Sequence, residues 1–259
     1  MVLHWIMKML CRNALCRKLS EKVRILQLKI QFRKEFLVFK KLSEKTDRRF
    51  ELSWEQRYPC LHEKTGETRF DRHYIFHPAW AARVLRATNP AYHVDLSSTL
   101  HFCTLVSAFV PVKFFDIRPA NLGLNGLTVE YADLTSLPFQ TNSLSSVSCM
   151  HVIEHIGLGR YGDRLDPEGD LKAVAELRRV IADKGNLLFV VPIGKPKVVF
   201  NAHRIYSYDQ VMDLFLQFRL IEFALVPDKP GDGGLIINAT KELADKQLYG
   251  CGCFWLRKE

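Results

Sequence analysis

The sequence predicts an α/β domain with a doubly wound, mostly parallel sheet, preceded by a basic helical extension. Across residues 71–259, short apolar runs typical of buried parallel strands alternate with segments of helical periodicity. The chain has 259 residues, 47% of them hydrophobic, which is enough to bury one full core. Charge is uneven, because residues 1–50 carry 14 Lys/Arg against 4 Asp/Glu, whereas the remainder carries 23 against 24. We therefore expect a basic extension and connector over residues 1–70 and one domain over residues 71–259.

The extension is expected to contain one long helix, over residues 14–41. Lys and Arg occupy much of its surface, and apolar residues recur every three or four positions as Leu15, Leu19, Val23, Leu26 and Ile30. Such a helix can lie on an anionic membrane surface, contact a protein partner, or cap the domain with a solvated basic face. The aromatic and glycine interleaving of single-strand binders is missing, so no nucleic-acid partner is expected.

The seven cysteines are odd in number and scattered, and Cys149 falls within an apolar strand pattern. This usage is typical of reduced intracellular thiols, so we expect a cytoplasmic protein, in contact with the inner membrane face if the basic helix binds lipid. Cys251 and Cys253 are separated by one residue, too few for a zinc knuckle, and a buried edge strand is expected there.

The first ten residues are apolar but are interrupted by His4 and Lys8. A secretory signal has a longer apolar stretch with its charges ahead of it, so no signal peptide is expected. No later run reaches the ~18 uninterrupted apolar residues that a membrane-spanning helix needs.

The expected elements of the domain alternate between helix and strand. The first is a helix over residues 78–86, with Pro78 in its first turn and a stop at Asn89-Pro90. The others are strands 92–96, 112–116, 127–131, 147–150, 186–191, 221–226 and 249–258, and helices 100–108, 170–182 and 207–218. In such a domain the ligand binds in a crevice outside the carboxyl ends of the central strands.

Acidic residues mark the ends of the first two strands. Asp95 precedes Ser97-Ser98-Thr99, a turn without glycine, whose small serines offer hydroxyl donors but are strained at positive φ. The alternative is that these residues cap the next helix. Asp116 follows Asp95 by 21 residues, near the ~20-residue spacing at which a carboxylate accepts the ribose hydroxyls in dinucleotide folds. Arg118 could neutralise this carboxylate instead.

The densest polar cluster follows the apolar run 147–150. His151, Glu154 and His155 lead into a turn rich in glycine, residues 157–163, at the carboxyl end of a buried strand. We therefore expect the crevice to open here.

The same cluster also fits the inverted zinc-protease pattern His-x-x-Glu-His, formed by His151, Glu154 and His155. That pattern needs a helix, which places both imidazoles on one face. The β-branched Val152 and Ile153 and the glycines that follow favour a strand and a turn. No metal is therefore expected, and a zinc hydrolase is kept as a rival hypothesis.

A second polar cluster, Phe200-Asn-Ala-His-Arg-Ile-Tyr206, follows the strand expected over residues 186–191 and belongs to the same rim. His203 is interpreted as a site residue, with a surface histidine as the alternative. Polar sets of this kind also recur as structural hydrogen-bond clusters around tight turns.

Taken together, these motifs resemble the class I S-adenosylmethionine-dependent methyltransferases. An aspartate, the loop Leu137-Pro-Phe139 and a strand that ends near Glu154-His155 are common in their cores. Within that group the chain is similar to an uncharacterised bacterial set, domain-of-unknown-function family 268, over about residues 70–259. The motifs that carry this resemblance are Ser97-Ser98, His151 to Asp163, Phe200 to Tyr206 and Tyr249-Gly-Cys-Gly-Cys-Phe254.

The resemblance implies a Rossmann-like sheet of seven strands, with an antiparallel ending, and S-adenosylmethionine as the cofactor. It places cofactor binding at Asp95, Ser97, Ser98, Asp116, Asp133, Leu134 and His151. Asp133 stands where related enzymes hold the adenine, although it fits a simple Asx turn nearly as well.

Methyl transfer to a hydroxyl needs a base, and histidine suits neutral pH. The candidate catalytic residues are therefore His155, His203 and Glu154. A polar acceptor, either a small molecule or a glycoconjugate, would be oriented by Arg160, Tyr161, Asp163, Asn201, Arg204 and Tyr206. The main alternative is a methyltransferase-like module that binds or assembles without catalysis, which the glycine-free turn supports.

Overall fold

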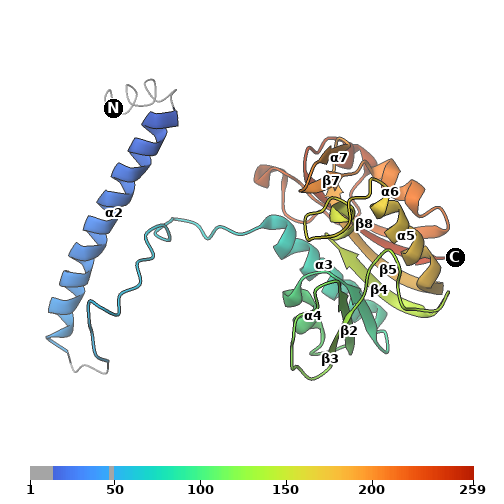
Figure 1. Cartoon of the computed structure of the whole chain (residues 1–259), viewed down its shortest axis with the longest axis horizontal. Helices are drawn as coiled ribbons and strands as arrows, with labels where there is room; N and C mark the ends of the chain where they lie inside the picture. The colour runs from blue at the N-terminus through green and yellow to red at the C-terminus, as the bar shows by residue number, and fades with distance from the viewer. Residues whose placement is uncertain (1–13, 47–49) are drawn as a thin grey trace. The chain divides into compact units, whose positions relative to one another are not determined.

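A computed structural model describes residues 14–46 and 50–259 of the chain (Figure 1). The chain divides into two compact units, residues 1–69 and residues 70–259. The N-terminal run 1–10, for which no signal peptide is expected, lies outside the described residues.

The second unit is built on seven strands: β1 (His93–Leu96), β2 (Val112–Asp116), β3 (Leu127–Tyr131), β4 (Leu144–Met150), β5 (Ile181–Ile193), β8 (Phe218–Val226) and β9 (Gly250–Lys258). They form one sheet in the order β3-β2-β1-β4-β5-β9-β8 (Figure 1). The first five pair in parallel, and β9 runs antiparallel to both of its neighbours. This is the Rossmann-like, mostly parallel sheet of the class I methyltransferase type, so the predicted fold class is confirmed.

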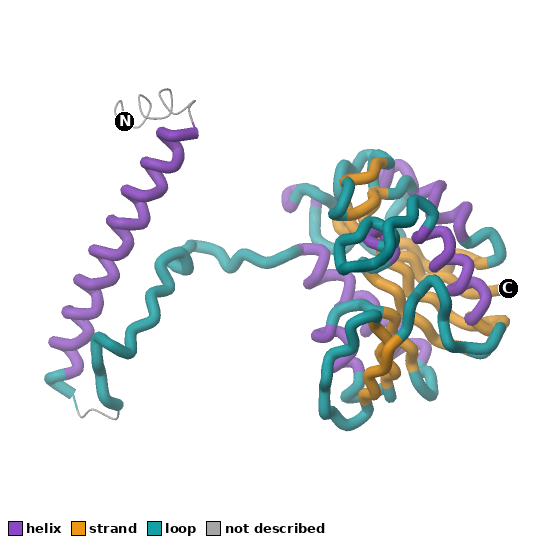
Figure 2. The backbone as a smooth tube through the Cα atoms, in the orientation of Figure 1, coloured by secondary structure: helices purple, strands orange, loops and turns teal. Residues whose placement is uncertain are grey.

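Helices cover both faces of this sheet (Figure 2). One face carries α3 (Arg72–Thr88) and α4 (Leu100–Val106), and the other carries α5 (Gly169–Val180), α6 (Tyr208–Leu214) and α7 (Lys241–Asp245). Successive strand residues point to opposite faces, so Phe189 of β5 joins one core and Val190 joins the other. Burying such a side chain stabilises the fold by roughly 2 kcal/mol.

The chain reverses its direction of travel across the sheet between β1 and β4. It moves outward from β1 to β2 and β3, and then returns to place β4 on the other side of β1. The carboxyl ends of β1 and β4 therefore border a crevice, which is where ligands bind in open α/β sheets.

Helix α3 differs from its prediction. It begins at Arg72, where the Asp71 side chain accepts a hydrogen bond from the Tyr74 amide, and Pro78 lies inside the helix rather than in its first turn. The proline removes one amide donor, and the burial of Trp80 and Leu85 against the sheet offsets that cost. Because of this earlier start, His73, Tyr74 and His77 belong to the helix.

Other boundaries shift by a few residues. Helix α5 ends at Val180 rather than 182, because Ile181 already pairs with Leu144 as the first residue of β5. Helix α6 ends at Leu214 rather than 218, since Phe218 begins β8. A short hairpin, β6 (Lys197–Val199) with β7 (His203–Ile205), was not predicted and carries part of the second polar cluster.

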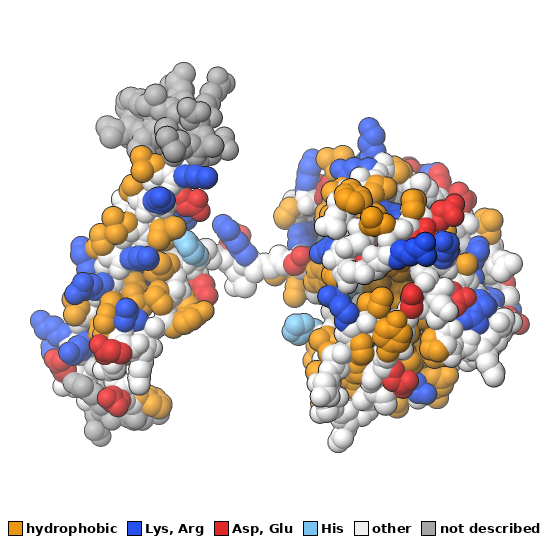
Figure 3. All heavy atoms as spheres, in the orientation of Figure 1, with side chains coloured by type: hydrophobic (Ala, Val, Ile, Leu, Met, Phe, Trp, Pro, Cys, Tyr) orange, Lys and Arg blue, Asp and Glu red, His pale blue; other side chains and the backbone are white. Residues whose placement is uncertain are grey.

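The first unit contains one long helix, α2 (Ala14–Ser43), close to its predicted bounds. Phe32 and Phe36 pack against Trp54, with ring centroids 5.9 and 4.8 Å apart. The predicted apolar stripe is exposed over the part whose side chains are described: Leu19, Val23, Leu26 and Ile30. Figure 3 shows hydrophobic and basic side chains side by side along this helix. The membrane or protein contact expected of it stays a prediction, and none of the described helices is long and apolar enough to cross a bilayer.

Candidate functional site

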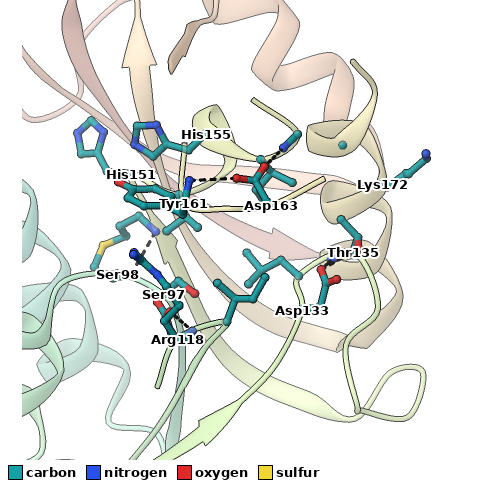
Figure 4. A pocket seen from close by; sticks show the side chains of 18 of the residues that line it. Ser97, Ser98, Arg118, Asp133, Thr135, His151, His155, Tyr161, Asp163 and Lys172 are labelled. Carbon is teal, nitrogen blue, oxygen red and sulfur yellow. Dashed lines mark hydrogen bonds between the residues drawn. The ribbon is translucent and has the colours of Figure 1, made fainter. Parts of the chain in front are cut away.

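A cavity of about 630 Å³ lies at the carboxyl ends of β1 to β4 (Figure 4). One side, here called the carboxylate wall, consists of Ser97, Ser98, Asp116, Asp133 and Leu134. The opposite side, the imidazole wall, consists of Tyr74, His151, His155, Tyr161 and Asp163. Figure 4 shows His151 and His155 across the hollow from Ser97 and Asp133. Nine of the predicted site residues thus share one cavity, and the others lie behind or beside it.

The turn after β1 does without glycine by placing Ser97 in the left-handed region, at φ 57°. Its amide and hydroxyl both donate to the Phe115 carbonyl, at 2.8 and 3.1 Å. The Ser98 hydroxyl accepts from the Met150 amide at 3.2 Å, which ties the turn to the end of β4. Thr99 caps α4 through its side chain. The serines therefore form the tight turn expected of them, at the steric cost that glycine would avoid.

Asp95 lies beneath this turn, fully buried and outside the cavity lining. Its Oδ1 accepts from the Ser98 amide at 3.0 Å, and its Oδ2 accepts from the Ser148 hydroxyl. His93 contacts the same hydroxyl through Nε2 at 2.8 Å. Burial raises the pKa of Asp95 to about 6. This predicted cofactor residue thus supports the turn from behind, because one carboxylate oxygen bonds the Ser98 amide of the turn and the other bonds Ser148 in the core.

Asp116 and Asp133 both line the cavity and each organises its own loop. Asp116 Oδ1 accepts from the Arg118 amide at 2.7 Å, while the Arg118 guanidinium lies over the Tyr161 ring, 4.6 Å from its centroid. Asp133 Oδ1 accepts from the Thr135 amide and hydroxyl at 2.8 and 2.7 Å. The Asx-turn role considered for Asp133 is therefore present, together with its place in the lining.

The segment after β4 is neither a continued strand nor an α-helix. His151 has φ 56°, and residues Ile153–His155 form one 3-10 turn, η1. A reversal at His151 turns its imidazole back towards Glu154, whose Oε1 lies 2.7 Å from His151 Nδ1. Burial lowers the pKa of His151, but Cys251 and Glu154 more than offset this and raise it to about 10. The one-face arrangement of His151 and His155 that the zinc-protease pattern requires is not formed.

His155 lies in the cavity lining, with Nδ1 2.5 Å from the Ala202 carbonyl. That contact assigns the ring proton to Nδ1 and leaves Nε2 as the basic nitrogen. Burial lowers the pKa of His155, so the ring is neutral near pH 7. Glu154 is only 1% exposed and lies behind the two imidazoles rather than in the lining.

The turn 157–163 is organised by Asp163. Its Oδ2 accepts from the Gly157 amide at 2.7 Å and its Oδ1 from the Tyr161 amide at 3.2 Å. Burial opposes the charge, but these backbone donors lower the pKa of Asp163 below its ordinary value. Gly157 has φ 79°, and a Cβ there would lie 2.0 Å from the Asp166 carbonyl oxygen, so only glycine fits. Arg160 donates to the Ala202 carbonyl at 3.1 Å, beside the lining.

The second polar cluster is mostly engaged in holding the fold. Arg204 donates to the Ile156 carbonyl at 2.6 Å, and Tyr206 donates to Asp170 at 2.9 Å. Asn201 donates to the Leu158 carbonyl at 3.4 Å, and His203 packs on Tyr249 with ring centroids 4.9 Å apart. None of these four residues is in the cavity lining.

Sequence reasoning missed residues that α3 and β9 contribute. Tyr74 reaches the imidazole wall, and His73 and Cys251 approach His151 from behind. Burial lowers the pKa of His73 to about 4 and that of His77 well below its ordinary value, so both rings are neutral. The signal that could have found the pair is the i, i+4 spacing of His73 and His77 after the capping residue Asp71.

The family described as "Caenorhabditis protein of unknown function, DUF268" matches residues 128–227. The family number agrees with the resemblance expected from the motifs, whereas the bacterial origin expected for it is not supported. No curated protein matches the chain.

Solved structures that resemble the chain include methyltransferases. The YcgJ protein of Bacillus subtilis is 15% identical, with TM-score 0.47 over 71% of this chain and 98% of its own. A Burkholderia thailandensis 1,6-didemethyltoxoflavin-N1-methyltransferase with S-adenosylhomocysteine is 10% identical, with TM-score 0.47 over 71% and 78%. The N-methyltransferase NodS of Bradyrhizobium japonicum, also with S-adenosylhomocysteine, is 12% identical, with TM-score 0.46 over 69% and 84%. The strand order of the sheet, rather than these distant likenesses, identifies the chain as having a class I methyltransferase-like fold.

Proposed function

We propose that the unit 70–259 is an S-adenosylmethionine-dependent methyltransferase that acts on a polar small molecule or glycoconjugate. The observation that carries the proposal is the composition of the cavity at the strand reversal. A tight turn and two carboxylates form one wall, and a neutral imidazole faces them from the other. Bound S-adenosylmethionine would supply an activated methyl group on a sulfonium.

The carboxylate wall fits an adenosyl group. Asp116 stands at the end of β2, where a carboxylate can accept two hydroxyls of one ribose. Leu134 offers an apolar surface for a planar base, with Asp133 beside it. The turn at Ser97 keeps its polar groups bonded to Phe115 and so presents backbone rather than a long side chain to the cavity. The absence of glycine therefore does not close the site.

The imidazole wall fits a polar acceptor. His155 has its basic Nε2 left for a proton, and a positioned base contributes about 10²- to 10⁴-fold to the rate when the acceptor is a hydroxyl. Tyr161 is stacked against Arg118 and offers a planar face together with a phenol hydroxyl. Such a surface suits a sugar or another hydroxylated group. Alignment of acceptor and methyl group supplies most of the remaining acceleration.

Calorimetry with S-adenosylhomocysteine tests the proposal. The full chain should show saturable binding, and Asp116→Ala should weaken it about 10- to 100-fold, since a hydrogen bond to a charged group is worth about 1.5–3 kcal/mol. The matched control is Asp183→Ala, which removes an exposed carboxylate near the amino-terminal end of β5, whereas Asp116 lies at the carboxyl end of β2. It should leave the affinity unchanged.

No heat at millimolar ligand would contradict the proposal and favour the non-catalytic binding module. Equal weakening by Asp116→Ala and Asp183→Ala would place the ligand elsewhere. A zinc hydrolase would instead be identified by stoichiometric zinc that depends on both His151 and His155.

A further inference from the structure

Three buried side chains from distant parts of the chain converge behind the imidazole wall. His73 comes from α3, His151 from the turn after β4, and Cys251 from β9. One nitrogen or sulfur atom of each lies within 4.8 Å of the other two. The His73 and His151 rings are stacked, with centroids 5.1 Å apart and planes 15° apart. The residues form a compact group of one thiol and two imidazoles.

One polar atom of this group and two beside it have no hydrogen-bond partner among the described residues. They are Nε2 of His151, Nε2 of the adjacent His77, and Oε2 of Glu154. His151 is 8% exposed, and His77 and Glu154 are 0% and 1% exposed. Leaving a buried polar group unsatisfied is unfavourable, and three in one place indicate that the pocket is built around something.

The contacts around His151 match those of a metal ligand. Its Nδ1 is held by Glu154 Oε1 at 2.7 Å, so the nitrogen that remains is Nε2. Metal-ligating histidines commonly donate their other ring nitrogen to a carboxylate, which fixes the ring orientation. On α3, His77 Nδ1 lies 2.6 Å from the backbone carbonyl of His73, so the remaining nitrogen of His77 is also Nε2.

The separations suit a small ion. Three atoms no more than 4.8 Å apart have a common point within about 2.8 Å of each, the separation divided by √3. Bonds from zinc to nitrogen and sulfur are about 2.0–2.3 Å, so each ligand atom would need to move by at most about 0.5–0.8 Å. Two imidazoles and a thiolate select zinc and similar borderline-soft ions over magnesium or calcium.

We propose that His73, His151 and Cys251 bind one zinc-class transition-metal ion, with Glu154 as the positioning residue for His151. Binding takes Cys251 as a thiolate and His151 with Nε2 unprotonated, so the thiol proton and the Nε2 proton are both released to solvent. With three protein ligands, a fourth position remains.

This set differs from the pattern His151, Glu154 and His155 seen in the sequence. Here Glu154 orients a ligand, and His155 is turned away to the Ala202 carbonyl. It also differs from the pair Cys251 and Cys253, since only Cys251 belongs to the group. The inference does not depend on methyl transfer: a chain that binds S-adenosylhomocysteine but no ion would refute it alone.

Cobalt titration of the chelator-treated full chain tests the site. We expect one Co²⁺ per chain, a thiolate-to-cobalt charge-transfer absorption, and displacement by Zn²⁺. Cys251→Ser should abolish the charge-transfer absorption, and His73→Gln should weaken binding at least tenfold. Glu154→Gln should weaken binding about 10- to 100-fold while the absorption remains, because an orienting residue affects affinity without supplying a ligand atom.

Two matched variants serve as controls, with folding monitored by circular dichroism. Cys253→Ser changes an equally buried thiol two residues along β9, and His155→Gln changes the other imidazole of the turn. Both should retain the ion and the absorption. The proposal is overturned if the folded wild-type chain shows no charge-transfer absorption. It is also overturned if His155→Gln loses the ion while His73→Gln keeps it.

Discussion

The two walls of the cavity satisfy their polar groups in different ways. On the carboxylate wall, Ser97, Asp116 and Asp133 are bonded within their own loops, to backbone groups two residues away or on the next strand. Behind the imidazole wall, His151 and Glu154 bond each other yet each keeps one buried polar atom without a partner among the described residues. The first wall is already formed and can receive a ligand as it stands. The second is complete only when another group binds.

The largest change in the free energy of unfolding is expected at the imidazole wall, where the first residue of the turn 157–163 has no room for a side chain. Gly157→Ala would bring a Cβ to 2.0 Å from the Asp166 carbonyl oxygen at φ 79°. Strain and overpacking together should lower the free energy of unfolding by about 4 kcal/mol. Urea denaturation measures this.

Gly162→Ala is the matched control, because it has φ 86° in the same turn but nothing within 4 Å of the added atom. It should cost about 1 kcal/mol, from the backbone conformation alone. Equal losses in the two variants would mean that the turn is not packed as described.

The carboxylate wall should respond to pH through the buried Asp95. Its pKa is raised to about 6 from an ordinary value of 3.8. Below pH 4 the group is protonated in both states. Between pH 4 and 6 the native state keeps a proton that the unfolded state loses, so stability falls as pH rises, by up to about 3 kcal/mol. Above pH 6 the contribution is constant.

Asp95→Asn should remove this fall, which urea unfolding between pH 4 and 7 can measure as the difference from wild type. Asp183→Asn, at an exposed carboxylate, should keep the wild-type profile. A fall of the same size in Asp95→Asn would show that another group is responsible.

The smallest change in the free energy of unfolding is expected at Ser97, in the turn after β1. Ser97→Gly relieves the left-handed backbone but loses the hydroxyl bond to Phe115 and makes the unfolded chain more flexible. The free energy of unfolding should therefore change by less than about 1 kcal/mol. Ser97→Val should be less stable by about 1–2 kcal/mol, since a β-branched residue is strained at φ 57°. Urea denaturation measures both variants. If Ser97→Val were more stable than Ser97→Gly, the left-handed backbone at this position would be contradicted.

Local patterns predicted the strands well because a buried parallel strand is a continuous apolar run. The bounds of β2 and β3 were predicted to the residue, and the strand pattern over residues 112–116 placed Asp116 at its strand end. The start of α3 was missed because Pro78 fits a first turn as well as an interior position. The partners of Arg204 and Tyr206 could not be predicted, since a polar run looks the same whether it faces a ligand or its own fold.

The grouping of His73, His151 and Cys251 was also beyond sequence reasoning. Each residue has an ordinary local setting, and only the packing of α3 and β9 around the end of β4 brings them together. The spacing of Cys251 and Cys253 argued against a metal, because spacing rules detect only ligands that lie close together in the sequence.

The most direct test of the account is a crystal structure of the full chain soaked with S-adenosylhomocysteine. We expect electron density for the ligand in the cavity, with the ribose hydroxyls within hydrogen-bond distance of Asp116 and the sulfur directed towards His155. A cavity closed by side chains from the turn at Ser97 to Thr99, or ligand bound away from Asp116, would contradict it.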